Sequence, residues 1–182
     1  MALAKQARAE LDARARLFQY ESLPPDRKRR GEKKLPRCIE LHLLQMACEK
    51  LCKAHLFISP KPPAGLLRRH DFIEGTLDAI FLMKFSETYK KNLGQRDSLY
   101  RRVKLAARDI GALVPKGSKK ENCEYPWCDE AGNIFVPAER PFANLDFLYK
   151  DPKGALFLNL VAAAIDSLCQ PAPLPPSILG RE

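Results

Sequence analysis

Residues 90–120 contain ten lysines and arginines, the side chains of this sequence with the clearest chemical use. Arg101, Lys104 and Arg108 stand at i, i+3 and i+7, a spacing that places them on one face of a helix. Only two acidic residues oppose the ten cations, so the segment carries a net charge of +8. Rows of such groups suit phosphate oxygens, and we expect this segment to bind DNA or RNA through the backbone. The cations expected to take part are Lys90, Lys91, Arg101, Arg102, Lys104, Arg108, Lys116, Lys119 and Lys120.

A second basic segment covers residues 26–37, where seven lysines and arginines face two acids for a net charge of +5. The whole chain carries +9, so these two segments hold all of the positive excess. The sequence admits two interpretations of the second segment: an arm that pairs with phosphates, and a plain linker. Its expected contacts come from Arg27, Lys28, Arg29 and Arg30.

Two alternatives to phosphate binding stay open for the basic helix. Its cations suit an ordinary solvated face, and they also suit docking on an acidic protein. Tyr89 and Tyr100 lie in the same region and have the ring faces on which a base can stack. The sequence shows no helix-turn-helix, zinc-finger or RNA-recognition signature, so the prediction is limited to contacts with the backbone.

The six cysteines are the other residues with potential chemistry. Cys48 and Cys52 lie one helical turn apart, and Cys123 and Cys128 flank a predicted strand, so the four could in principle ligate zinc. Their C-x3-C and C-x4-C spacings differ from the C-x2-C knuckles of common zinc sites. Buried structural cysteines are the favoured interpretation, with zinc and a redox pair as alternatives.

No catalytic template matches this sequence. His70 and Asp71 are adjacent, but neighbouring residues on a helix point in different directions, and Asp71 also serves as a helix cap. His55 and Cys52 could touch, although they lie on an apolar face that disfavours a reactive thiol. We therefore expect a non-enzymatic protein without a cofactor, with an enzyme as the least favoured possibility.

Helical periodicity dominates the chain and predicts a mainly α protein, a bundle of about five helices. Helices are expected at residues 2–21, 37–58, from Asp71 to a stop at Gly94, at 97–114 and near 151–170. The second is the most apolar and should be central, with a polar stripe of Gln45, Glu49 and Lys53. A small β-hairpin is expected near residues 123–136, where Gly132 supplies turn chemistry.

The expected organisation is a single domain over residues 1–182. Six free thiols without a secretion signal favour a cytoplasmic protein, and no apolar run is long enough for a membrane span. The best functional interpretation is a nucleic-acid-binding accessory protein or a subunit of a nucleoprotein assembly; the alternative is a protein–protein adaptor or inhibitor. The predicted parts are a basic connector (22–37), a helical core (38–120), a hairpin and loop region (121–150), a buried helix (151–170) and a Pro-rich tail (171–182).

Overall fold

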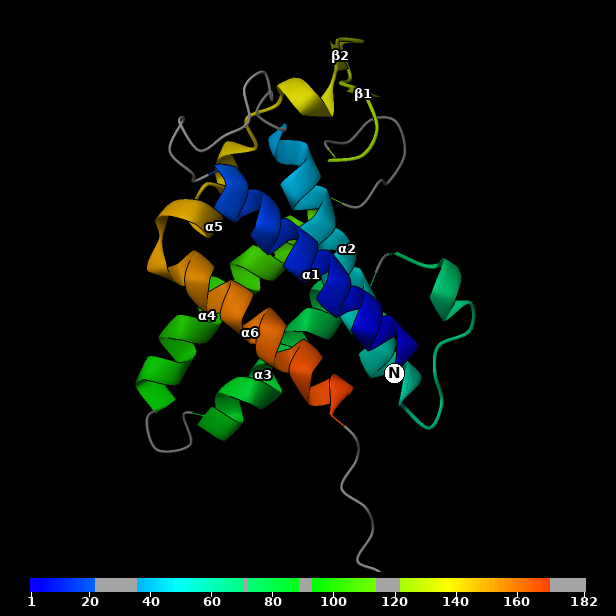
Figure 1. Cartoon of the computed structure of the whole chain (residues 1–182), viewed down its shortest axis with the longest axis vertical. Coiled ribbons are helices and arrows are strands. Elements are labelled where there is room, and N and C mark those ends of the chain that lie inside the picture. The colour runs from blue at the N-terminus through cyan, green and yellow to red at the C-terminus, as the bar shows by residue number, and fades with distance from the viewer. Residues whose placement is uncertain (22–35, 71, 89–92, 114–121, 171–182) are drawn as a thin grey trace, which may run out of the picture.

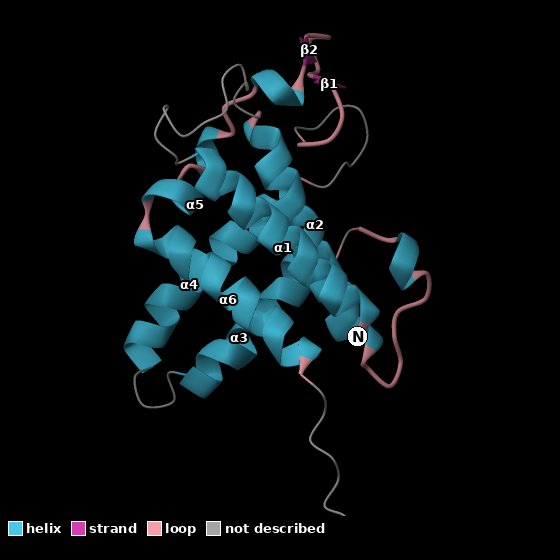
Figure 2. Cartoon of the chain, viewed as in Figure 1, coloured by secondary structure: helices cyan, strands magenta, loops and turns pink. Residues whose placement is uncertain are grey.

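The structure, a computed structural model, describes residues 1–21, 36–70, 72–88, 93–113 and 122–170. Helices dominate, and the described strands are confined to a hairpin at one end (Figure 2). The predicted mainly α fold with a small hairpin is confirmed. The helices are α1 (Ala2–Glu21), α2 (Arg37–Phe57), α3 (Ile73–Thr88), α4 (Leu93–Ala112), α5 (Phe147–Lys150) and α6 (Pro152–Cys169), with 3₁₀ turns at Leu66–Arg68, Pro137–Glu139 and Ala143–Leu145.

Helix α2 is the centre of the bundle, as its apolar composition predicts. It contacts α1, α3, α4 and α6, and Figure 1 shows α1 and α6 toward the viewer with α3 and α4 behind them. Leu41, Leu44 and Leu51 are fully buried. Burying side chains of this size contributes about 1.5–3 kcal/mol each, so α2 supplies much of the energy of the core.

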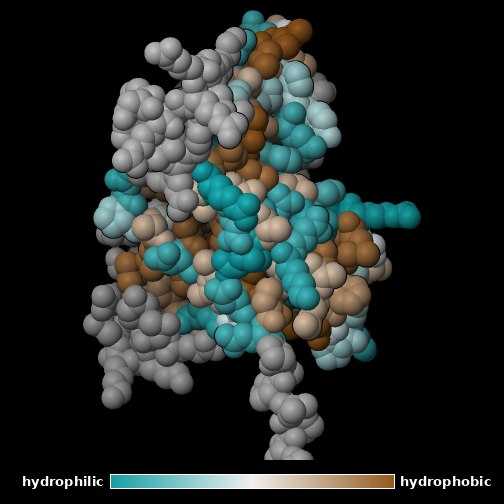
Figure 3. Space-filling view, in the orientation of Figure 1, coloured by the Kyte–Doolittle hydropathy of each residue, from teal (hydrophilic) through white to brown (hydrophobic). Residues whose placement is uncertain are grey.

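Charged pairs join the helices around this core. Arg8 of α1 donates to Asp166 of α6 and to the carbonyl oxygen of Ala162. The Lys50 ammonium of α2 lies 3.4 Å from the Glu10 carboxylate of α1. The exposed residues of α1 mix alanines with hydrophilic side chains, and Figure 3 shows hydrophilic and weakly hydrophobic residues side by side in the middle of that face.

The boundary between α3 and α4 differs from the expectation. Gly94 was expected to stop the third helix, and that prediction is wrong, because α3 ends at Thr88 and Gly94 lies in the first turn of α4. The next helix was expected from residue 97, but α4 begins four residues earlier, at Leu93. A glycine costs a helix only about 1 kcal/mol and does not by itself end one. The expected cap at Asp71 lies outside the described residues.

The predicted hairpin is present, with β1 (Trp127–Cys128) antiparallel to β2 (Ile134–Phe135). In its turn, the Asp129 carboxylate accepts hydrogen bonds from the backbone amides of Ala131 and Asn133. Gly132 has φ of 85°, a conformation that glycine adopts without strain. The local turn chemistry read from the sequence is therefore confirmed.

Helix α6 begins at Pro152, close to the predicted start of the last helix, but only one of its faces is buried. Phe157, Val161 and Ile165 point into the core, whereas Asn159 and Asp166 are exposed. The expectation of a buried helix is thus corrected to an amphipathic one. Among the described residues, no helix is both long enough and apolar enough to cross a membrane.

Candidate functional site

Helix α4 separates an apolar face from a basic one, as its spacing predicts. Val103, Ala106 and Ile110 are buried against the bundle. Arg101, Lys104 and Arg108 are all exposed on the other side. We call these three side chains the basic face of α4.

Acidic neighbours reduce the charge of this face. The Lys104 ammonium lies 3.1 Å from a carboxylate oxygen of Asp78 on α3, and Arg108 donates to Asp109 at 3.2 Å. The side chains of Lys104 and Arg108 remain 52% and 57% exposed, so both pairs are open to solvent. Exposed pairs of this kind are worth about 0–1 kcal/mol, which leaves the cations able to exchange partners. Arg101 has no such pair among the described residues.

Tyr100 was a candidate for base stacking, but both its ring and its hydroxyl contact other side chains of the bundle. Its ring packs edge-on against Phe85, with the centroids 6.2 Å apart, and its hydroxyl donates to Asp78 at 2.7 Å. Burial, together with this hydrogen bond to a carboxylate, raises the pKa of Tyr100 to about 12. Tyr100 therefore anchors α4 to α3.

Most of the other residues predicted to contact nucleic acid are outside the part of the chain that the structure describes. Lys90, Lys91, Lys116, Lys119 and Lys120 lie outside the described residues, as do Arg27, Lys28, Arg29, Arg30 and Tyr89, and so does the side chain of Arg102. The structure thus brings three predicted cations together, on α4.

The four cysteines considered for zinc are found in different surroundings. Cys48 and Cys52 are fully buried in α2, and burial raises the pKa of Cys48 to about 12 and that of Cys52 well above its ordinary value. Cys123 is also buried, with a pKa raised to about 12, and a further part of that rise comes from Cys38. Cys128 is partly exposed in β1. The described residues contain no group of three or more histidine, cysteine or acidic side chains that could hold a metal ion.

A buried polar cluster occupies the stripe of α2 that the sequence indicated as its polar side. Gln45, Glu49 and Lys53 are only 2%, 3% and 5% exposed. The Glu49 carboxylate accepts hydrogen bonds from Lys53 Nζ at 2.6 Å and from Gln45 Nε2 at 3.3 Å. His70 Nδ1 lies 2.8 Å from the same carboxylate. We call these four residues the Glu49 cluster.

The charge of Glu49 is maintained by this arrangement. Burial by itself would raise the pKa of Glu49, but the hydrogen bonds from His70 and Lys53 outweigh it and lower the pKa. Lys53 also donates to the carbonyl oxygen of Leu67 at 2.9 Å. The cluster therefore ties the 3₁₀ turn at Leu66–Arg68 to the centre of the bundle.

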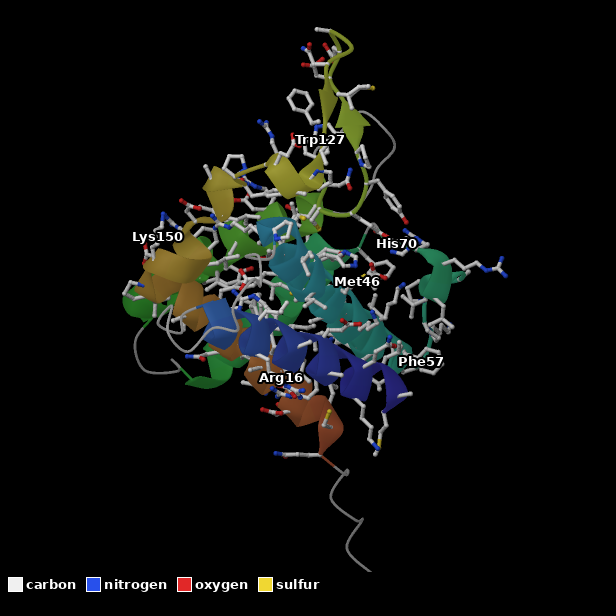
Figure 4. All side chains as sticks on the ribbon, turned by 45° about the horizontal axis from the view of Figure 1, so that its top comes forward. Arg16, Met46, Phe57, His70, Trp127 and Lys150 are labelled. Atoms are coloured by element: carbon white, nitrogen blue, oxygen red, sulfur yellow. The ribbon has the colours of Figure 1, made fainter. Side chains whose placement is uncertain are left out.

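A pocket of about 320 Å³ opens beside the Glu49 cluster. It is lined by Gln45, Met46 and Glu49 of α2, by His70, and by Glu124 and Tyr125, which come just before β1. Figure 4 shows His70 and Met46 on the same side of the molecule, next to the 3₁₀ turn. The sequence contained one signal for this site, the i, i+4, i+8 spacing of Gln45, Glu49 and Lys53, but that spacing equally describes a solvated stripe.

Comparisons give no independent guide to this chain: no family model, no curated protein and no solved structure matches it.

Proposed function

We propose that the protein binds the phosphate backbone of DNA or RNA through the basic face of α4, as a non-enzymatic accessory protein or subunit of a nucleoprotein assembly. The observation that carries this proposal is the exposure of Arg101, Lys104 and Arg108 together on one helical face. Three cations so placed can follow successive phosphates, and each releases a condensed counterion when it does so.

The ion pairs of this face support an exchange of partners. Asp78 and Asp109 hold Lys104 and Arg108 in place in the free protein, in solvent-exposed pairs of small net energy. A nucleic acid supplies more negative charge than these carboxylates, so the cations can pair with phosphates at little cost. The proposal extends to the lysines that flank α4 in the sequence; together with α4 they lie in residues 90–120, which carry a net charge of +8.

The test is a titration of random duplex and single-stranded oligonucleotides at several salt concentrations. If the protein binds phosphates, the logarithm of the association constant should fall linearly with the logarithm of the salt concentration. On duplex DNA the slope is about 0.9 per neutralised phosphate. The variant Arg101→Glu/Lys104→Glu/Arg108→Glu should lower the size of this slope by up to about 2.7 and weaken binding at every salt concentration.

A matched control separates this face from net charge. Lys5→Glu/Arg16→Glu/Lys61→Glu changes the charge of the chain by the same amount at three exposed positions outside α4. This control should retain most of the salt slope. An equal loss in both triple variants, or no binding by the wild type at low salt, would contradict the proposal.

One observation favours a second function, docking on an acidic protein. Leu105 lies on the same side of α4 as the three cations and is 51% exposed. Apolar side chains are anchors of protein interfaces more often than of phosphate contacts. Leu105→Ala should leave oligonucleotide affinity unchanged if phosphates are the ligand, whereas an acidic protein partner should lose affinity.

A further inference from the structure

The pocket beside the Glu49 cluster presents an unused acceptor from a buried side chain. Gln45 is 2% exposed and lines the pocket. Because a carboxylate only accepts hydrogen bonds, the Gln45 amide must turn its nitrogen toward Glu49, at 3.3 Å. Its carbonyl oxygen has no hydrogen-bond partner among the described residues. This oxygen is not among the buried atoms that lack a partner, so solvent reaches it, and a donor from a ligand in the pocket can bind it.

His70 adds a further polar side chain to the pocket. Its Nδ1 lies 2.8 Å from Glu49 Oε2 and donates a hydrogen bond to that oxygen, because a carboxylate only accepts. Nε2 is the remaining polar atom of the ring. The side chain is 54% exposed, which leaves this nitrogen accessible from the pocket.

Glu124 and Tyr125 supply a carboxylate and an aromatic ring to the pocket. Glu124 is an exposed carboxylate, and the Tyr125 hydroxyl donates a hydrogen bond to it. The Tyr125 ring is 56% exposed, and Met46 contributes an apolar surface to the pocket. Lys53 pairs with Glu49, and Glu124 adds a second carboxylate at the pocket.

We propose that this pocket binds a guanidinium group carried on a short aliphatic stem. The Gln45 carbonyl oxygen and the Glu124 carboxylate at this pocket are acceptors, so a ligand that binds both of them must donate. Guanidinium offers five N–H donors, pairs with a carboxylate and stacks on aromatic rings such as that of Tyr125. The volume of about 320 Å³ lies within the range of small-ligand sites. This inference is independent of phosphate binding by α4, because it uses other residues and the opposite ligand charge.

The first test is isothermal titration of the full chain with n-butylguanidinium and with n-butylurea. The two probes have the same shape, but the urea replaces a charged donor group with a carbonyl acceptor. We expect n-butylguanidinium to bind at least tenfold more tightly. Equal affinity for the two probes would overturn the proposal, as would absence of binding by n-butylguanidinium at about 10 mM, roughly tenfold above a Kd of 1 mM.

Two carboxamide variants localise the site. Glu124→Gln removes the charge that faces the pocket and should weaken n-butylguanidinium binding at least tenfold. Glu130→Gln makes the same change at an exposed residue of the hairpin turn outside the pocket and should alter the affinity less than twofold. Both positions are on the surface, so neither variant should unfold. Equal effects of the two variants would show general attraction of a cation, against the proposal.

Further probes distinguish the source of the guanidinium. N-acetyl-arginine N-methylamide presents it as a partner protein would. If this arginine derivative binds at least as tightly as n-butylguanidinium, the pocket takes an arginine side chain. If it binds much more weakly, the pocket takes a free small molecule. Either result upholds a guanidinium ligand. Binding of guanosine monophosphate in place of n-butylguanidinium would instead identify a nucleotide site and overturn the proposal.

Discussion

At the scale of single residues, Glu49 and Lys53 illustrate how a buried ion pair depends on both partners. Their side chains are 5% and 7% exposed, and their charged atoms are 2.6 Å apart. Removal of one partner leaves the other charge buried without compensation, which costs about 3–5 kcal/mol. Replacement of both by apolar residues of similar volume avoids that penalty.

We therefore predict that Glu49→Leu lowers the free energy of unfolding by about 3–5 kcal/mol, because it strands the Lys53 ammonium. The double variant Glu49→Leu/Lys53→Met should recover most of this loss. Urea denaturation of the wild type, both single variants and the double variant gives the coupling energy. Additive effects of the two single changes would contradict the role assigned to the pair.

The lowered pKa of Glu49 predicts a dependence of stability on pH. Its pKa in the folded chain lies below the value of 4.5 expected for the unfolded chain. Its stabilising contribution is therefore complete above pH 4.5 and is lost as the pH falls through the lower, folded-state pKa. Between pH 6 and pH 3, the wild type should lose more stability in urea than Glu49→Leu/Lys53→Met does. Parallel losses would show that Glu49 is not the responsible group.

At the scale of elements, the junction of α5 and α6 depends on a close approach of two backbones. A Cβ added at Gly154 of α6 would lie 2.3 Å from the carbonyl oxygen of Phe147 and 2.5 Å from Cα of Leu148. Both obstacles are backbone atoms of α5, so the helices would have to separate. Glycine is required at this position by packing, although it is an inferior helix former.

We predict that Gly154→Ala destabilises the protein by about 1–3 kcal/mol, the usual cost of overpacking. Gly75→Ala is the matched control, since Gly75 lies within α3 and no atom comes within 4 Å of the added Cβ. There alanine should raise the stability by about 0.5–1 kcal/mol through its higher helix propensity. Thermal unfolding should shift the midpoint in opposite directions; shifts of the same sign would refute the proposed contact.

At the scale of the whole molecule, access to the cysteines should report global unfolding. Cys48 and Cys52 are fully buried where α2 meets its neighbours, and both have raised pKa values. Cys128 and Cys169 are partly exposed. We expect a thiol reagent to modify Cys128 and Cys169 in the folded protein. Cys48 and Cys52 should react only in molecules that have unfolded, so their modification should follow the unfolding rate or the unfolded fraction.

This labelling can be followed by peptide mass spectrometry at increasing urea. Modification of Cys48 and Cys52 should rise together with the loss of helical circular dichroism. Their rapid modification without urea would mean that α2 opens locally, contrary to its central position in the bundle.

The sequence predicted the features that depend on near neighbours in the chain. The apolar spacing of Val103, Ala106 and Ile110 correctly indicated which face of α4 is buried, and the turn at Gly132 correctly indicated the hairpin. It failed at Gly94, because a glycine costs a helix only about 1 kcal/mol, so its presence does not by itself fix where a helix ends.

Composition and periodicity by themselves determined that this protein is a helical bundle with a basic face on α4, since both follow from the identity of residues three or four positions apart. Only the tertiary structure decided that Gln45, Glu49 and Lys53 are buried, because their burial depends on His70 and Leu67 from the neighbouring loop and on the pocket wall at Glu124 and Tyr125. The same stripe on an uncovered helix would be an ordinary solvated surface. Contacts between residues distant in the chain make it a candidate binding site.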